Sequence, residues 1–250
     1  MKYLASILLL MLPFIIHAQE GFKVTMHIKG LGDHNVKVVF QKNGRSDVDT
    51  LVKQGEDLVV WEGKTVDPQF VRMEVMDTSL YLRVGKAIMP APALAFLLAN
   101  TNITINGDAK EIFTATVESK HPEVVLYNNL RVADLPNAIE TWTLQKEQNK
   151  KRNNNDTIGN YDISQKLTIL KKKNQAMRIK FLDENPASFT SLLVLQSLFL
   201  ILPVNESDKR FNALKAEHKN SVTGQAHNLK IESNKKTAVG KPAIPFALEG

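Results

Sequence analysis

The distribution of glycine and of apolar residues changes sharply near residue 119, and this change most limits the possible fold. Before it, short runs alternate apolar with polar residues and are separated by glycine, proline or asparagine. Between residues 120 and 220 the only glycine is Gly159. Alternation is typical of half-buried strands, whereas glycine-poor segments rich in leucine, lysine and glutamate favour helix. We therefore predict an α+β protein with a β-rich part followed by a helical part.

The β-rich part contains roughly seven or eight candidate strands. In "FKVTMHIKG" the apolar residues from Phe22 to Ile28 alternate with polar ones, which indicates one buried face. A turn segment at 30–35 leads to "VKVVF", so these two runs are expected to pair as a hairpin, and Asn43-Gly44 predicts a second tight turn. Further strands are expected near 48–52, 57–63, 69–76, 93–98, 100–108 and 113–119. The pattern predicts an antiparallel β-sandwich or partial barrel.

The helical part has recognisable start and stop signals. His121-Pro122 favours a helix start, and the helix is expected to run to about 151 with an interruption at Pro136. A second helix is predicted over 162–182 and ends before Pro186. The apolar segment 187–202 predicts a buried third helix, Ser207 is expected to cap a fourth that runs to 216, and a fifth is expected over 223–236. Lys171, Lys172 and Lys173 are interpreted as a solvated helix face.

The first 18 residues have the pattern of a secretory signal peptide. Lys2 precedes an uncharged run from Leu4 to Ile16, and Ala18 supplies a small residue at the expected cleavage site. A membrane anchor would need about 20 apolar residues, so no transmembrane anchor is expected once this segment is removed. We therefore predict an exported protein of the periplasm or cell envelope. The net charge is +6, but the lysines are scattered, so nucleic acid is not an expected partner.

No catalytic, cofactor-binding or metal-binding residue can be assigned from the sequence. There is no cysteine, so these residues hold no disulfide, thiol nucleophile or cysteine metal site. No two histidines have the i, i+4 spacing of a zinc pair, and surface positions are expected for all five that follow the signal segment: His27, His34, His121, His218 and His227. The carboxylates Asp47, Asp49, Glu56 and Asp57 cluster around turns. Trp61 and Trp142 could stack on a ligand but are more typical of packing groups.

The last twelve residues, "VGKPAIPFALEG", resemble the opening of the thioredoxin-fold domain in TlpA-like thiol–disulfide oxidoreductases of the AhpC/TSA group. Gly240, Ala243, Phe246 and Leu248 match that pattern, whereas Ile244 and Pro245 depart from it. The β-rich start, "ITINGD" and "FLDENPASFTSLLVLQSL" are similar to the N-terminal accessory region of unassigned function that precedes such domains. The resemblance implies four parts: a signal peptide (1–18), a β-rich accessory domain (19–119), a helical connector (120–237) and the start of a truncated thioredoxin-like domain (238–250).

Three functional hypotheses remain open from the sequence. The resemblance implies the accessory region of a periplasmic thiol–disulfide oxidoreductase, present here as a fragment that lacks the redox-active Cys-x-x-Cys and is inactive alone. The alternative is a stand-alone periplasmic module that binds a peptide, a glycan or another envelope protein, in which the helices could form a homo-oligomer. The third hypothesis, an enzyme of another class, has no supporting constellation of residues.

Overall fold

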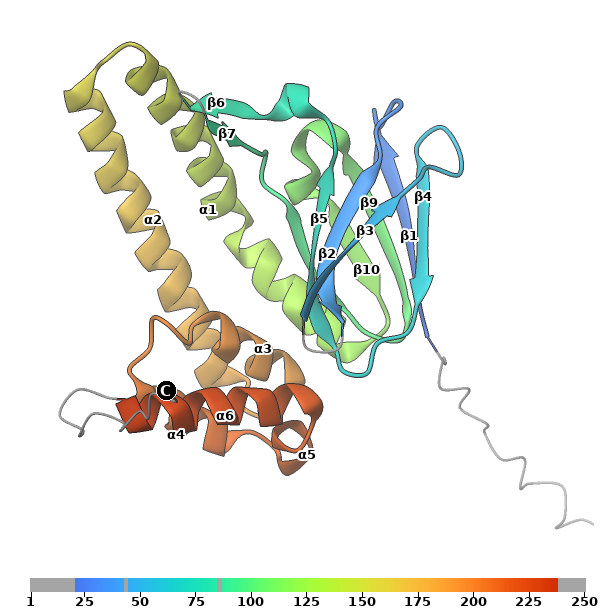
Figure 1. Ribbon diagram of the computed structural model, residues 1–250, viewed down its shortest axis with the longest axis vertical. Coiled ribbons are helices and arrows are strands. Elements are labelled where there is room, and N and C mark those ends of the chain that lie inside the picture. The colour runs from blue at the N-terminus through green and yellow to red at the C-terminus, as the bar shows by residue number, and fades with distance from the viewer. Residues whose placement is uncertain (1–20, 43–44, 85–86, 238–250) are drawn as a thin grey trace, which may run out of the picture.

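The protein is described by a computed structural model that covers residues 21–42, 45–84 and 87–237 (Figure 1). The predicted signal peptide, the Asn43-Gly44 turn and the segment that resembles a thioredoxin-fold opening lie outside the described residues. The predicted α+β class is confirmed: ten strands come first along the described chain, and six α-helices follow them.

Eight of the described strands form two four-stranded sheets that pack as a sandwich (Figure 1). The first sheet has the order β10 (Thr116–Ser119), β9 (Asn102–Asp108), β1 (Phe22–Lys29) and β4 (Leu58–Gly63). The second has the order β3 (Arg45–Leu51), β2 (Val36–Lys42), β5 (Gln69–Val75) and β8 (Leu94–Leu98). The pairs are antiparallel except for β1 with β9, which are parallel. The described strands form no closed barrel.

The predicted hairpin between β1 and β2 is wrong, because the two strands belong to different sheets. Their connection contains Gly30 and Gly32, both at positive φ, and between them Leu31, which is fully buried. A positive φ suits glycine, so this segment can turn sharply and place Leu31 in the core. Both strands have one apolar face, and the sandwich buries both faces by placing the strands in opposite sheets.

Strands β2 and β3 are antiparallel neighbours, and their register pairs Lys42 with Arg45, the residues on either side of Asn43-Gly44. A small hairpin that the sequence reasoning missed consists of β6 (Leu82–Val84) and β7 (Ala87–Met89), and β6 lies against the first helix. Two short 3-10 helices, η1 (Thr78–Leu80) and η2 (Ala109–Thr114), complete the β-rich part.

The helices form a long antiparallel hairpin followed by a compact bundle (Figure 1). The hairpin consists of α1 (Pro122–Asn153) and α2 (Thr157–Glu184). The bundle contains α3 (Phe189–Ser197), α4 (Val204–Ala213), α5 (Ala216–Lys219) and α6 (Val222–Thr237). The predicted start of α1 is confirmed, since the His121 ring accepts a hydrogen bond from the Glu123 N–H. No helix in the described part of the chain has the length and apolar character needed to cross a membrane.

Several expected helix details are wrong. Helix α1 continues through Pro136 without interruption. Pro136 lies on the exposed side of α1, whereas the opposite side of the helix is packed. The third helix ends at Ser197, and the following turn leaves Leu200 almost fully exposed. Ser207 does not cap α4. Instead α4 begins at Val204, and Ser207 lies fully buried inside it.

One hydrophobic core includes side chains from both sheets and from α1, α2, α3, α4 and α6. Two carboxylates reinforce this contact by capping helices far along the chain. Asp67, which precedes β5, accepts a hydrogen bond of 2.8 Å from the Thr223 N–H in the first turn of α6. Glu123 does the same for α3. A carboxylate at a helix N-terminus satisfies free N–H groups and interacts favourably with the helix dipole. The Asp67 contact holds the bundle against the β-rich part, and the Glu123 contact holds it against α1.

Candidate binding pocket between α2, α3 and α4

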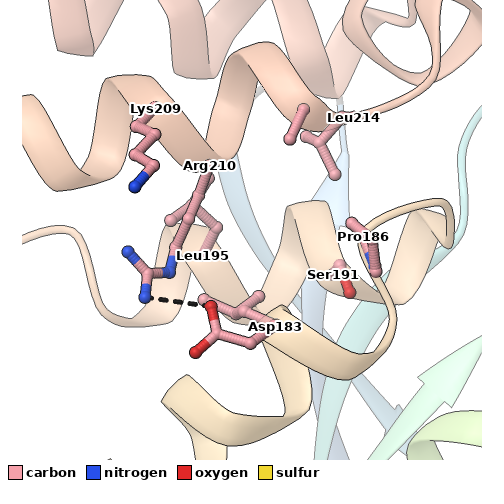
Figure 2. A pocket seen from close by; sticks show the side chains of 9 residues that line it. Asp183, Pro186, Ser191, Leu195, Lys209, Arg210 and Leu214 are labelled. Atoms are coloured by element: carbon pink, nitrogen blue, oxygen red, sulfur yellow. Dashed lines mark hydrogen bonds and ion pairs between the residues drawn. The ribbon is translucent and has the colours of Figure 1, made fainter.

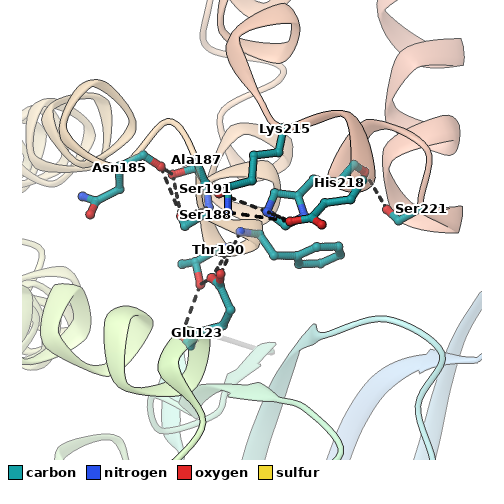
Figure 3. A network of polar contacts seen from close by, with 11 residues as sticks. Glu123, Asn185, Ala187, Ser188, Thr190, Ser191, Lys215, His218 and Ser221 are labelled. Carbon is teal, nitrogen blue, oxygen red and sulfur yellow. Dashed lines mark hydrogen bonds and ion pairs between the residues drawn. The ribbon is translucent and has the colours of Figure 1, made fainter.

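The start of α3 is held by the carboxylate of Glu123 on α1 (Figure 3). This carboxylate accepts hydrogen bonds from the Phe189 N–H at 3.1 Å, the Thr190 N–H at 2.8 Å and the Thr190 hydroxyl at 2.7 Å. Thr190 is fully buried, so its hydroxyl depends on partners within the protein. The contacts link residues 66 and 67 positions apart and therefore set the position of α3 relative to α1.

The loop between α2 and α3 is folded back by serine side chains (Figure 3). The Ser191 hydroxyl donates to the Asn185 carbonyl at 2.6 Å, and the Ser188 side chain accepts from the Ser191 N–H at 3.1 Å. His218 holds the same loop from α5, because its Nε2 lies 3.0 Å from the Ala187 carbonyl, which can only accept a hydrogen bond. These bonds give the loop, including Pro186, a defined shape.

This loop forms one wall of a pocket of about 230 Å³ (Figure 2). The apolar lining comes from three elements and the loops that follow them: Leu182, Pro186, Leu195, Ala213 and Leu214. Polar groups lie beside the apolar lining: Asp183, Ser191, Lys209 and Arg210. The apolar walls with few polar groups have the composition of a ligand pocket, and the volume, which is below the roughly 300–1,000 Å³ of small-molecule sites, suits a single side chain.

The two cations at the pocket differ in their partners. Arg210 forms ion pairs with Asp183, at 3.0 Å, and with Glu206, and its guanidinium is mostly buried. Lys209 is exposed, forms no ion pair with the described residues and extends from α4 beside Arg210 (Figure 2). Arg210 therefore holds α4 against the end of α2, whereas Lys209 is available to a negatively charged ligand. The pocket suits an apolar side chain that has a carboxylate next to it.

A second pocket of about 170 Å³ lies between β8, α1 and α2. Two arginines line it, Arg131 and Arg178. Arg131 donates to the Ala115 carbonyl at 2.7 Å, to the Phe113 carbonyl at 3.3 Å and to the side chain of Asn128. Burial lowers the pKa of Arg131. Because the guanidinium is already occupied by the protein's own acceptors, it joins α1 to the segment before β10 and is not available to a ligand.

The sequence-derived candidates do not come together in either pocket, except that His218 supports a wall of the first. Asp49 accepts a hydrogen bond of 3.0 Å from the Trp61 indole, and the Trp61 ring packs on Phe22 and Phe40. Asp57 accepts one from the Leu31 N–H. Asp47 forms an ion pair with Lys42, and Glu56 is exposed. Trp142 is buried and lies under the Lys146 ammonium. The predicted packing role fits both tryptophans.

The expectation of surface histidines is wrong for His227, which is fully buried. Its ring packs against Phe199 and Phe211, and neither ring nitrogen has a hydrogen-bond partner among the described residues. Burial, and secondarily the charge of Lys230, lowers the pKa of His227 to about 4. His227 lies four residues before the buried Ile231, so both belong to the packed face of α6.

Within the described residues no group of three or more histidine, aspartate or glutamate side chains is placed to hold a metal ion. Sequence reasoning missed the pocket residues around Lys209 and Arg210. The available signal was the i, i+4, i+7 spacing of Ser207, Phe211 and Leu214, which indicates that one side of α4 is packed and that the two cations flank it.

Comparison of the chain with models of protein families, with curated proteins and with solved structures gave no match. Interpretation of the site therefore depends on its own geometry.

Proposed function

We propose that this chain is a recognition module that binds an extended segment of a partner polypeptide, with an apolar side chain of that segment in the pocket between α2, α3 and α4. The observation that carries the proposal is the combination of an apolar lining with the exposed, unpaired ammonium of Lys209 at its edge. A buried apolar anchor supplies most of the affinity in such a contact, and a charge at the rim selects among partners.

The resemblance to accessory regions of TlpA-like oxidoreductases supports the proposal that this module belongs to an exported envelope protein. There the module would hold a partner near a redox domain. These 250 residues contain no cysteine, so disulfide exchange itself would be done by another domain or protein. The attachment of the bundle to the β-rich part through Asp67, and to α1 through Glu123, supports a positioning role, because a bound partner would be held in a fixed orientation.

The test uses fluorescence anisotropy with the full chain and labelled peptides that carry a central leucine. We expect the peptide with flanking glutamates to bind at least about tenfold more tightly than the one with flanking lysines, which corresponds to about 1.4 kcal/mol. Ala213→Trp should abolish binding by filling the mouth of the pocket, since Ala213 is an exposed lining residue. Lys209→Glu should remove the preference for the acidic peptide.

Two matched controls make the result specific. Ala216→Trp places the same side chain on the exposed start of α5, outside the pocket lining, and Lys236→Glu makes the same charge change on α6. Both should bind the acidic peptide as the unchanged protein does. Equal binding of both peptides, or equal loss of binding in Ala213→Trp and Ala216→Trp, would reject the pocket as the recognition site.

A further inference from the structure

The outward side of α2 exposes three large apolar side chains. Ile158, Tyr161 and Ile169 have 76%, 63% and 65% of their surface accessible. Positions three and eleven residues apart return to the same side of a helix, so the three form a stripe about 16 Å long. The exposed Gln165 lies within this stripe, and the exposed Asp162 lies beside it. Side chains on the opposite side of α2, Ile163, Leu167 and Leu170, pack with Leu144 of α1.

No other described element covers this stripe. In Figure 1, α1 lies between α2 and the sheets, and the far side of α2 forms the edge of the molecule. Single exposed apolar residues are common, but three on one helix face next to charged residues indicate an interaction surface.

The hairpin that carries the stripe also holds much of the positive charge of the chain. Residues 143–173 contain three acidic side chains, Glu147, Asp156 and Asp162, and eight basic ones: Lys146, Lys150, Lys151, Arg152, Lys166, Lys171, Lys172 and Lys173. The excess is five, compared with a net charge of +6 for all 250 residues. Lys166, Lys172 and Lys173 are exposed and lie three or four positions from Ile169, so they flank the stripe directly.

We propose that this α2 surface, formed by Ile158, Tyr161, Lys166, Ile169, Lys172 and Lys173, docks onto an anionic phospholipid bilayer. Helix α2 would lie in the plane of the membrane with its apolar stripe among the headgroups, which is a peripheral contact and not a span. The lysine ammoniums would meet lipid phosphates while their aliphatic stems follow the apolar stripe.

The composition of the surface favours a bilayer over a protein partner. Protein interfaces are depleted in lysine and enriched in arginine, whose planar guanidinium suits paired contacts with a carboxylate. The cations that flank this stripe are all lysines, which are mobile point charges that suit a diffuse layer of phosphates. Tyr161 also fits, because tyrosine is enriched where apolar and aqueous surroundings meet.

The experiment places an environment-sensitive fluorophore on the α2 surface. The chain has no cysteine, so Tyr161→Cys and, as a control on the β-rich part, Val66→Cys give singly labelled full-length proteins. Val66 is exposed in the same way, with 85% of its surface accessible. Vesicles of phosphatidylcholine and phosphatidylglycerol, in a ratio of about two to one, are compared with phosphatidylcholine alone. Both labelled proteins contain the mostly apolar residues 1–20, so any binding of that segment to vesicles is common to both. The label at position 161 or 66 reports only on its own surroundings.

We expect the label at position 161 to brighten with the anionic vesicles only, and the label at position 66 to stay unchanged. Replacing Lys166, Lys172 and Lys173 together by glutamine should weaken this response about 100-fold at low salt. The same change at the exposed Lys29, Lys64 and Lys120 should have little effect. Salt at about 0.5 M should suppress the response. No response at position 161, or equal responses at both positions, would overturn the proposal. A response to polyglutamate but not to vesicles would assign the surface to an acidic protein instead.

Discussion

Removing the Glu123 carboxylate should destabilise the protein strongly, although the residue is only partly buried. In Glu123→Ala the N–H groups of Phe189 and Thr190 lose their acceptor at the start of α3. Hydrogen bonds to a charged group contribute roughly 1.5–3 kcal/mol each to stability. In the variant, water that reaches the two N–H groups replaces part of this contribution. We therefore expect the free energy of unfolding to fall by about 3 kcal/mol. Glu123→Gln keeps one acceptor oxygen and should lose about half as much.

The assay is equilibrium unfolding in urea, followed by circular dichroism and by the fluorescence of Trp61 and Trp142, which report on the sandwich and on α1. Glu140→Ala is the matched control, since Glu140 is exposed on the same helix and makes no bond of this kind. Its effect should stay within about 0.5 kcal/mol. A double-mutant cycle with Thr190→Val should give a coupling of about 1 kcal/mol. If Glu123→Ala and Glu140→Ala unfold at the same urea concentration, the capping account of α3 is refuted.

Two further predictions concern the core of the helical part. Leu195→Asp should strongly destabilise the bundle, because it replaces a fully buried apolar side chain by a charged one, and a soluble variant with unchanged circular dichroism would contradict this. His227 should make stability depend on pH. Its pKa is lowered to about 4 in the folded protein, so between about pH 6.5 and 4 the unfolded chain binds more protons and stability falls as the pH falls, by up to about 3 kcal/mol. In His227→Leu the urea midpoint of unfolding should change less with pH across this range. If the midpoint changes with pH as much as in the unchanged protein, other groups cause the pH dependence.

The sequence predicted the fold class and most strands because alternation depends only on which face is buried. The buried side of β1 agrees with its pattern at every position from Phe22 to Ile28. Which strands pair with each other could not be predicted in the same way. Two strands can bury their apolar faces either as neighbours in one hairpin or in opposite sheets of a sandwich. In the sandwich, the connection between β1 and β2 also buries Leu31.

The pocket could not be predicted because it depends on contacts between distant segments. Its walls come from α2, α3 and the end of α4, and the position of α3 is set by Glu123, which lies 67 positions before Thr190. His227 was misjudged because histidine is commonly exposed, although its spacing from Ile231 indicated the packed face of α6.

Photo-crosslinking of a bound peptide tests the central claim, recognition by the pocket, most directly. A peptide with a central diazirine-bearing leucine analogue and flanking glutamates would be irradiated with the full chain, and the modified residues would be identified by mass spectrometry. We predict adducts on the pocket lining, at Pro186, Lys209 or Leu214, that disappear in Ala213→Trp and persist in Ala216→Trp. Adducts scattered over the sandwich, or an identical pattern in both variants, would contradict the account.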